Sequence, residues 1–354
     1  MSGYDYGNTR LRAMKSRLLS RETLESLAMS ESLQALITAL TKTSYCKAVE
    51  AALARATGLA VIAEALRQDL SETLGKIRQF YQGSAAQNVA LLLRTYDVQN
   101  LKSVLRGLAR LLPPEEIMAA VLPVGELPES IWIQLARAYG PREAIDLLAT
   151  LRQPFAQPLL ALRVEKPGAT TTEMELALEH WYFEQAKEYL KSTTRAPTCL
   201  VATLKLEADL LNLLTVLRFA HAPAERSRLD ENGLRDLLVG PGKLSFQVLE
   251  VAGGQDTLEE AVALLAGTPY TTALQAGLTA YRDSGRLSNF ERHLRLYRLR
   301  WMRKQIVQDP LGIGVPVGYL ALKANEVSNL RWIAHGLRQE LDSRAIRAGL
   351  ELLE

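Results

Sequence analysis

Three short stretches of this chain are variants of one another: DVQNLKSVLRGL at residues 97–108, DLLNLLTVLRFA at 209–220 and EVSNLRWIAHGL at 326–337. Each begins with an acidic residue, places Asn-Leu three residues later and has an apolar residue three positions after that leucine. Residues three or four apart share one face of an α-helix, so the acid and the asparagine lie together beside a buried apolar stripe. The pattern predicts the same helix three times, and we call it the signature helix.

The spacing of other matches supports an internal repeat. The second and third signature helices are 117 positions apart, and the first and second are 112 apart. EAIDLLA at 143–149 matches EAVALLA at 260–266 with the same 117-residue offset, as GEL at 125–127 matches GKL at 242–244. Independent segments that share one offset indicate a repeated structural unit rather than chance similarity among Leu-rich segments.

A tyrosine turn belongs to the same pattern. TSY at 43–45 resembles TPY at 268–270, and Phe155 holds the place of the tyrosine in the middle copy. Two interpretations of the repeated polar residues stay open. They lock the packing of helices inside each unit, because a buried polar side chain needs a partner, or they bind a shared partner.

Composition and repeat length together predict an all-α protein of three similar helical domains. Leucine and alanine dominate the 354 residues, aromatic residues make up 6%, and no region shows sustained two-residue alternation. Three copies of about 117 residues fill the chain, and such a unit is too long for a tetratricopeptide or HEAT repeat. We therefore expect helical domains at 1–120, 121–238 and 239–354.

Charge and hydropathy argue against two classes of protein. A net charge of +3, from 42 basic and 39 acidic residues, is unlike that of a dedicated nucleic-acid binder. The uncharged stretch 261–281 is long enough to span a membrane, but Gly267, Thr268 and Pro269 interrupt it. We expect two buried helix pieces joined by a turn in this stretch.

No motif predicts catalysis, a metal or a cofactor. The four histidines form no HExxH pattern, neither cysteine lies in a CxxC pattern, and there is no GxSxG motif. GPGK at 240–243 lacks the spacing of a phosphate loop, and a proline removes one of the amides that such a loop needs. The sequence therefore predicts no catalytic residue, no metal site, no cofactor and no small-molecule substrate.

Two basic clusters are candidates for partner contacts. One lies near the start of the chain, and the other lies in a predicted helix that also holds Tyr297 and Trp301. The basic face of this second helix has two interpretations. It is either a solvated surface, or a docking strip for an acidic protein partner or an anionic membrane surface. The candidate interface residues are Arg292, Arg295, Arg298 and Arg303.

The segment at 310–333 resembles the C-terminal signature of a known family. That family is the central-stalk subunit of V-type and A/V-type rotary ATPases, called C in prokaryotes and d in eukaryotes. The residues that match its pattern are Tyr319, Leu320, Lys323, Glu326, Val327, Asn329, Leu330 and Arg331. A glutamate often follows the lysine in the family, whereas this chain has Ala324 and Asn325 there. The start of the chain is also similar, with Tyr4, Tyr6, Asn8, Arg10 and Arg12.

The resemblance implies a funnel of three helical domains that is peripheral to the cytoplasmic face of a membrane. It implies a non-catalytic rotor component that links the central shaft to the membrane proteolipid ring, and indirectly to the ATP-hydrolysing head. Such a component couples ATP hydrolysis or synthesis to proton or sodium transport, and binds no nucleic acid. The alternative is a helical adaptor of another multi-subunit assembly.

Overall fold

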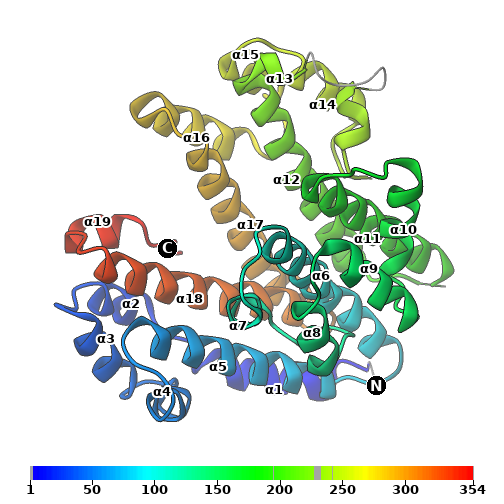
Figure 1. The fold of residues 1–354 in the computed structure, drawn as a ribbon. Helices are drawn as coiled ribbons and strands as arrows, with labels where there is room; N and C mark the ends of the chain where they lie inside the picture. Colours follow the sequence, from blue (N-terminus) through cyan, green and yellow to red (C-terminus); the bar gives the residue numbers. More distant parts are fainter. Residues whose placement is uncertain (1–2, 194, 227–232, 241, 354) are drawn as a thin grey trace. The chain divides into compact units, whose positions relative to one another are not determined.

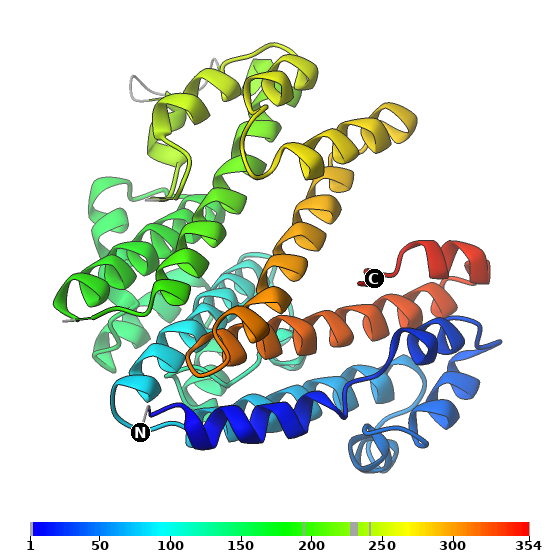
Figure 2. The ribbon, with the colours of Figure 1, turned by 180° about the vertical axis from the view of Figure 1, so that it is seen from behind.

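The computed structural model describes residues 3–193, 195–226, 233–240 and 242–353. Within these ranges the chain is built from helices joined by turns, and no residue is in a strand (Figures 1 and 2). The predicted all-α fold class is therefore confirmed. The chain divides into two compact units, one formed by Met1–Met174 with Arg303–Glu354 and the other by Glu175–Met302.

The first unit contains helices from both ends of the chain. They are α1 (Asp5–Lys15), α2 (Arg21–Leu27), α3 (Leu33–Leu40), α4 (Cys46–Leu53), α5 (Leu59–Gln79), α6 (Gly83–Ala109), α7 (Pro114–Ala120), α8 (Glu129–Ala136), α9 (Pro141–Thr150), α10 (Ala156–Glu165), α18 (Gly314–Arg338) and α19 (Ser343–Ala348). The long helix α18 packs against α1, α2, α3 and α5, so the C-terminal part of the chain completes a core begun by the N-terminal helices. Figures 1 and 2 both show α18 beside α1 and α5.

Two helices have residues in both units: α11 (Thr171–Ser192), with which the second unit begins along the chain, and α17 (Ser288–Gln308), with which it ends. Its other helices are α12 (Thr198–His221), α13 (Pro223–Arg226), the 3₁₀ helix η1 (Gly233–Leu237), α14 (Phe246–Gly253), α15 (Leu258–Leu264) and α16 (Thr271–Ser284). Helix α12 packs against α14 and α15, just as α6 packs against α7, α8 and α9 in the first unit.

The uncharged stretch 261–281 forms the end of α15 and most of α16, with a turn between them. Gly267 has a φ of +82°, which favours glycine, and Pro269 follows in the same turn. The prediction of two helix pieces is confirmed, although Leu264 is 45% exposed and the stretch is only partly buried. In the described residues, no helix combines the length and hydropathy that crossing a membrane requires.

The three signature helices lie within α6, α12 and α18. Each packs against the helices that follow it in the chain; α6 also packs against the preceding helix α5, and α18 also packs against helices from the beginning of the chain. The division into domains at 1–120, 121–238 and 239–354 stays a prediction. What the structure does provide is a comparison, contact by contact, of the three signature helices.

Candidate functional site

The asparagine of each signature helix makes the same pair of hydrogen bonds. Its side-chain oxygen accepts from a backbone amide, and its side-chain nitrogen donates to the carbonyl of the same residue. The pairs are Asn100 with Leu122, at 2.9 and 2.7 Å, Asn212 with Val239, at 2.8 and 2.7 Å, and Asn329 with Glu351, at 2.8 and 3.2 Å. All three asparagines are buried, and each satisfies both backbone groups of one loop residue while its own side-chain amide gains two partners.

The acid of each signature helix accepts hydrogen bonds from a second loop. Together with the groups that it contacts, we call it an acid site. Asp97 accepts from the Glu126 amide at 2.5 Å, and Asp209 accepts from the Lys243 and Leu244 amides at 3.0 and 3.1 Å. Glu326 accepts from the Leu19 amide. Each signature helix is thus joined to loops at two points, one turn apart.

The glycines found by the repeat comparison have a packing reason. A Cβ atom on Gly125 would lie 2.0 Å from Asp97 Oδ2, and one on Gly242 would lie 1.8 Å from Asp209 Oδ1. The short aspartate side chain brings its loop so close to the helix that only glycine fits. Glu326 is longer by one methylene, and Leu19, whose amide it accepts from, lies in a loop without glycine. Pro241, in the predicted glycine turn, lies outside the described residues.

A tyrosine hydroxyl completes two of the three acid sites. Tyr45 immediately precedes α4 and donates to Glu326 at 2.7 Å, and Tyr270 immediately precedes α16 and donates to Asp209 at 2.7 Å. Both rings are buried, and burial is the main cause that raises the pKa of each phenol, with the charge of its carboxylate partner adding to it. The hydroxyls therefore stay protonated donors at neutral pH.

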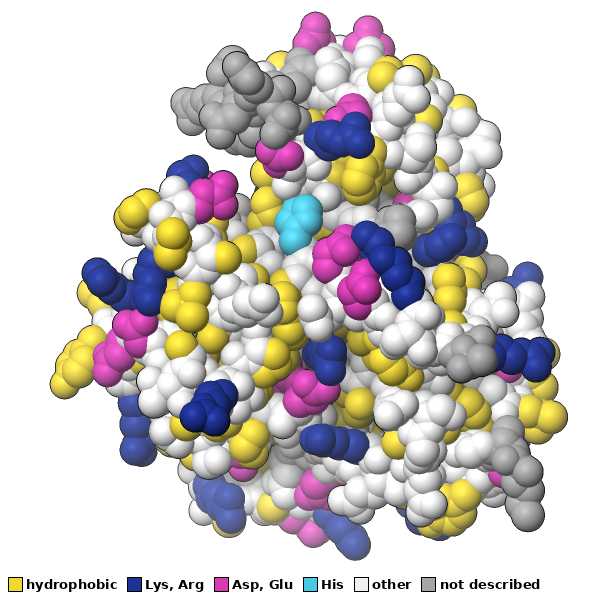
Figure 3. Space-filling view, turned by 90° about the vertical axis from the view of Figure 1, so that its right-hand side faces the viewer, with side chains coloured by type: hydrophobic (Ala, Val, Ile, Leu, Met, Phe, Trp, Pro, Cys, Tyr) yellow, Lys and Arg dark blue, Asp and Glu magenta, His cyan; other side chains and the backbone are white. Residues whose placement is uncertain are grey.

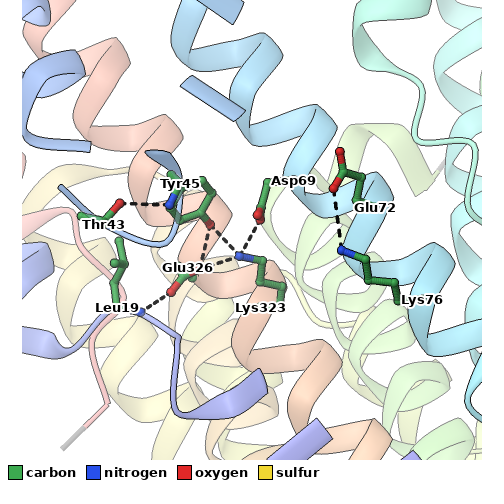
Figure 4. Close-up of polar contacts among 8 residues, drawn as sticks. All are labelled: Leu19, Thr43, Tyr45, Asp69, Glu72, Lys76, Lys323 and Glu326. Atoms are coloured by element: carbon green, nitrogen blue, oxygen red, sulfur yellow. Dashed lines mark hydrogen bonds and ion pairs between the residues drawn. The ribbon is translucent and has the colours of Figure 1, made fainter. Parts of the chain in front are cut away.

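The Glu326 site also contains a buried cation (Figure 4). Lys323 Nζ lies 2.8 Å from Glu326, 2.7 Å from Asp69 on α5 and 2.9 Å from the Tyr45 hydroxyl. It also lies 4.4 Å from the centre of the Tyr45 ring. One ammonium group therefore faces two carboxylates, and the site joins α18 to the α1–α2 loop, α4 and α5. With both side chains of the Lys323–Glu326 pair nearly inaccessible, the pair is fixed rather than solvated.

The predicted family-signature residues divide into two groups in the structure. Tyr319, Lys323, Glu326 and Asn329 lie on the buried face of α18, and burial together with the charges of Glu326 and Asp69 raises the pKa of Tyr319. Arg331 is exposed and lies away from this network. Asp69 was absent from the sequence prediction because no signature motif includes it, and it lies among other polar residues of α5, such as Arg67 and Glu72, that gave no signal for it.

The predicted interface arginines all lie on α17. Arg298 pairs with Glu207 at 2.6 Å, Arg295 lies 3.8 Å from Glu291, Arg292 is half-buried and Arg303 is exposed. On the face drawn in Figure 3, basic and acidic side chains are interspersed rather than gathered into one patch of a single sign. The structure leaves open both interpretations of this strip, a solvated face and a docking surface.

The acid sites join helices to loops through buried polar contacts. Buried charge of this kind is costly unless it is fully paired, and it specifies one arrangement of helices rather than several. The fold and these sites define an all-α protein in which each of three equivalent helices is fixed at two polar points to the segments around it.

Comparison with known proteins identifies the family. A family model described as ATP synthase (C/AC39) subunit matches residues 7–349, so the chain belongs to this family, as the resemblance predicted. It is similar to the C subunit of the A-type ATP synthase of Pyrococcus abyssi, with 26% identity over 94% of this chain and 85% of the relative. It is also similar to the C subunit of the V-type ATP synthase of Deinococcus radiodurans, with 25% identity over 97% and 90% of the two chains. The A-type C subunit of Methanosarcina acetivorans is 27% identical over 99% and 94%.

Proposed function

We propose that this chain is the central-stalk rotor subunit of an A/V-type ATP synthase. In this role it receives the central shaft, rests on the membrane proteolipid ring at its cytoplasmic face, and connects indirectly with the ATP-hydrolysing head. It carries out no catalysis itself and couples ATP hydrolysis or synthesis to proton or sodium transport. The observation that carries the proposal is the family match from residue 7 to residue 349.

The geometry of the acid sites supports a part that transmits torque. A connector under load must not let its helices slide past one another. The Glu326 site resists such sliding because it ties α18 to the α1–α2 loop, α4 and α5 through short polar contacts. Moving α18 by one helical turn would carry Lys323 and Glu326 together away from Asp69, the Tyr45 hydroxyl and the Leu19 amide, and a buried ion pair that loses its surrounding partners is strongly unfavourable.

Co-purification tests the proposed partners. The tagged full-length chain is isolated from detergent-solubilised membranes, and the proteins that accompany it are identified by mass spectrometry. We expect shaft subunits and the ring proteolipid, together with the head subunits in substoichiometric or equal amount. Capture of a different assembly without the proteolipid would favour the helical adaptor instead.

Coupling gives a second measurement that does not depend on stable capture. We expect membranes lacking this chain to retain ATP hydrolysis by the head but to lose ATP-driven ion uptake into vesicles, with recovery on adding the purified chain. Hydrolysis by the purified chain alone would contradict the proposed non-catalytic role. Unimpaired ion uptake in its absence would contradict the rotor role.

The α17 arginines are the proposed partner surface, and charge reversal tests them. Arg295→Glu with Arg303→Glu changes the strip by four charges while leaving the Arg298–Glu207 pair intact. A matched control is Arg110→Glu, at an exposed helix end outside this strip. We expect the double variant to lower assembly and ATP-driven ion uptake by at least severalfold while the control leaves both unchanged. Equal behaviour of the two variants would support the solvated-face interpretation.

A further inference from the structure

The first acid site lacks a donor that the other two have. Phe155 immediately precedes α10 and is buried, and in the sequence repeat it takes the place that Tyr45 and Tyr270 take before α4 and α16. It has the same aromatic ring but no hydroxyl. Asp97 Oδ1 is buried and, among the described residues, has no hydrogen-bond partner, whereas Oδ2 accepts from the Glu126 amide.

The charged groups around Asp97 do not make up for the missing hydroxyl. Glu126, in the facing loop, disfavours the charged form of Asp97, and the cation of Arg94 is already paired with Glu126 at 2.6 Å. Arg78 of α5 favours the charged form, but it donates to the Gly125 carbonyl rather than to the carboxylate. Within the described part of the chain, no charged group of α7, α8 or α9 is hydrogen-bonded to Asp97.

We propose that Asp97 is a proton-binding site: in the closed state it carries a proton near neutral pH, and loss of that proton loosens the loop at 121–128 from α6. The other two acid sites stay closed over the same pH range, since a tyrosine hydroxyl donates a hydrogen bond to each of their carboxylates. Burial favours the neutral carboxyl and raises the pKa of Asp97 to about 7, although the Glu126 and Leu127 amides both favour the charged form.

The direction of the effect follows from linkage. Once the loop opens, the carboxyl is hydrated and returns to its ordinary pKa of about 3.8, so the open state binds the proton more weakly than the closed state. Low pH therefore favours the closed loop and high pH favours the open one. Between pH 6 and pH 8 the closed-to-open ratio should fall about tenfold.

Amide hydrogen exchange of the full-length chain tests the proposal. Exchange of the Glu126 and Leu127 amides is measured from pH 6 to pH 8 and corrected for intrinsic exchange, which gives a protection factor for each. We expect their protection to fall about tenfold over this range. The Lys243 and Leu244 amides at the Asp209 site serve as an internal control and should show no such fall.

Reciprocal aromatic substitutions separate this proposal from a general effect of pH. Phe155→Tyr should remove the pH dependence at Glu126 and Leu127, and Tyr270→Phe should create one at Lys243 and Leu244. Protection at Glu126 and Leu127 that is independent of pH in the unaltered chain would overturn the proposal, as expected if a buried water serves as the missing donor. A pH dependence that persists in both Phe155→Tyr and Asp97→Asn would overturn it as well.

Discussion

Replacing Lys323 by methionine should destabilise the first unit more than any surface substitution. The change keeps most of the apolar stem and removes the ammonium group, which contacts Glu326, Asp69 and the Tyr45 hydroxyl at 2.7–2.9 Å. Breaking a buried pair by removing one partner costs about 3–5 kcal/mol. Glu326 would keep the Tyr45 and Leu19 donors, and the 23% exposure of the Asp69 side chain lets that carboxylate take up water. We therefore expect the lower end of the range, about 3 kcal/mol.

Calorimetry of the full-length chain measures this loss. For a unit of this size, about 3 kcal/mol corresponds to a fall of roughly 6–12 °C in the transition that reports the first unit. A matched control is Lys76→Met, whose surface pair with Glu72 should contribute less than about 1 kcal/mol. A fall of less than about 2 °C, equal to that of the control, would refute the reasoning.

Four further substitutions test other positions of the chain. Asn212→Ala leaves both backbone groups of Val239 unpaired in a buried loop and should cost about 2–4 kcal/mol in urea unfolding of the second unit. Gly242→Ala should destabilise the same unit by at least about 2 kcal/mol, because the added Cβ would clash with Asp209 in the second acid site. Gly75→Ala is the control: its added Cβ meets no atom within 4 Å, so it should stabilise α5 by about 0.5–1 kcal/mol. The pKa of Asp97 in the folded chain lies above its ordinary value, so the contribution of Asp97 to the free energy of unfolding should fall as the pH rises from about 4 to about 7, by at most about 4 kcal/mol. Asp97→Asn should abolish this dependence of the unfolding free energy on pH.

The sequence was sufficient for those features that repeat at a fixed spacing. The acid and the asparagine of each signature helix fall on one face because they are three residues apart, and the structure places them in equivalent contacts. The glycines at 125 and 242 appeared as part of a shared offset, and their cause is the close approach of a carboxylate. Periodicity and turn residues were thus enough to predict the helices and to predict which polar side chains share a helix face.

Other features could not be predicted from pattern alone. Asp69 enters the Glu326 site from α5, and no repeated position announces it, since the contact depends on how two helices distant in sequence pack. The same holds for Leu19 and Tyr45, which reach Glu326 over separations of 307 and 281 residues. Sequence spacing predicts which face of a helix a residue occupies, but only tertiary packing decides what that face meets.

The three acid sites differ in the hydrogen-bond donors and cations that surround the buried carboxylate. A buried carboxylate needs enough donors or a cation to offset the water that it has lost. Glu326 has an amide, a phenol and Lys323, Asp209 has two amides and a phenol, and Asp97 has amides alone. The weakest site therefore belongs to α6, and under load or at high pH this helix should part from its loop before α12 or α18 does. The group that the Asp97 site lacks is the hydroxyl that a tyrosine at position 155 would supply. In our proposal, this one oxygen atom distinguishes the pH-dependent Asp97 site from the other two acid sites.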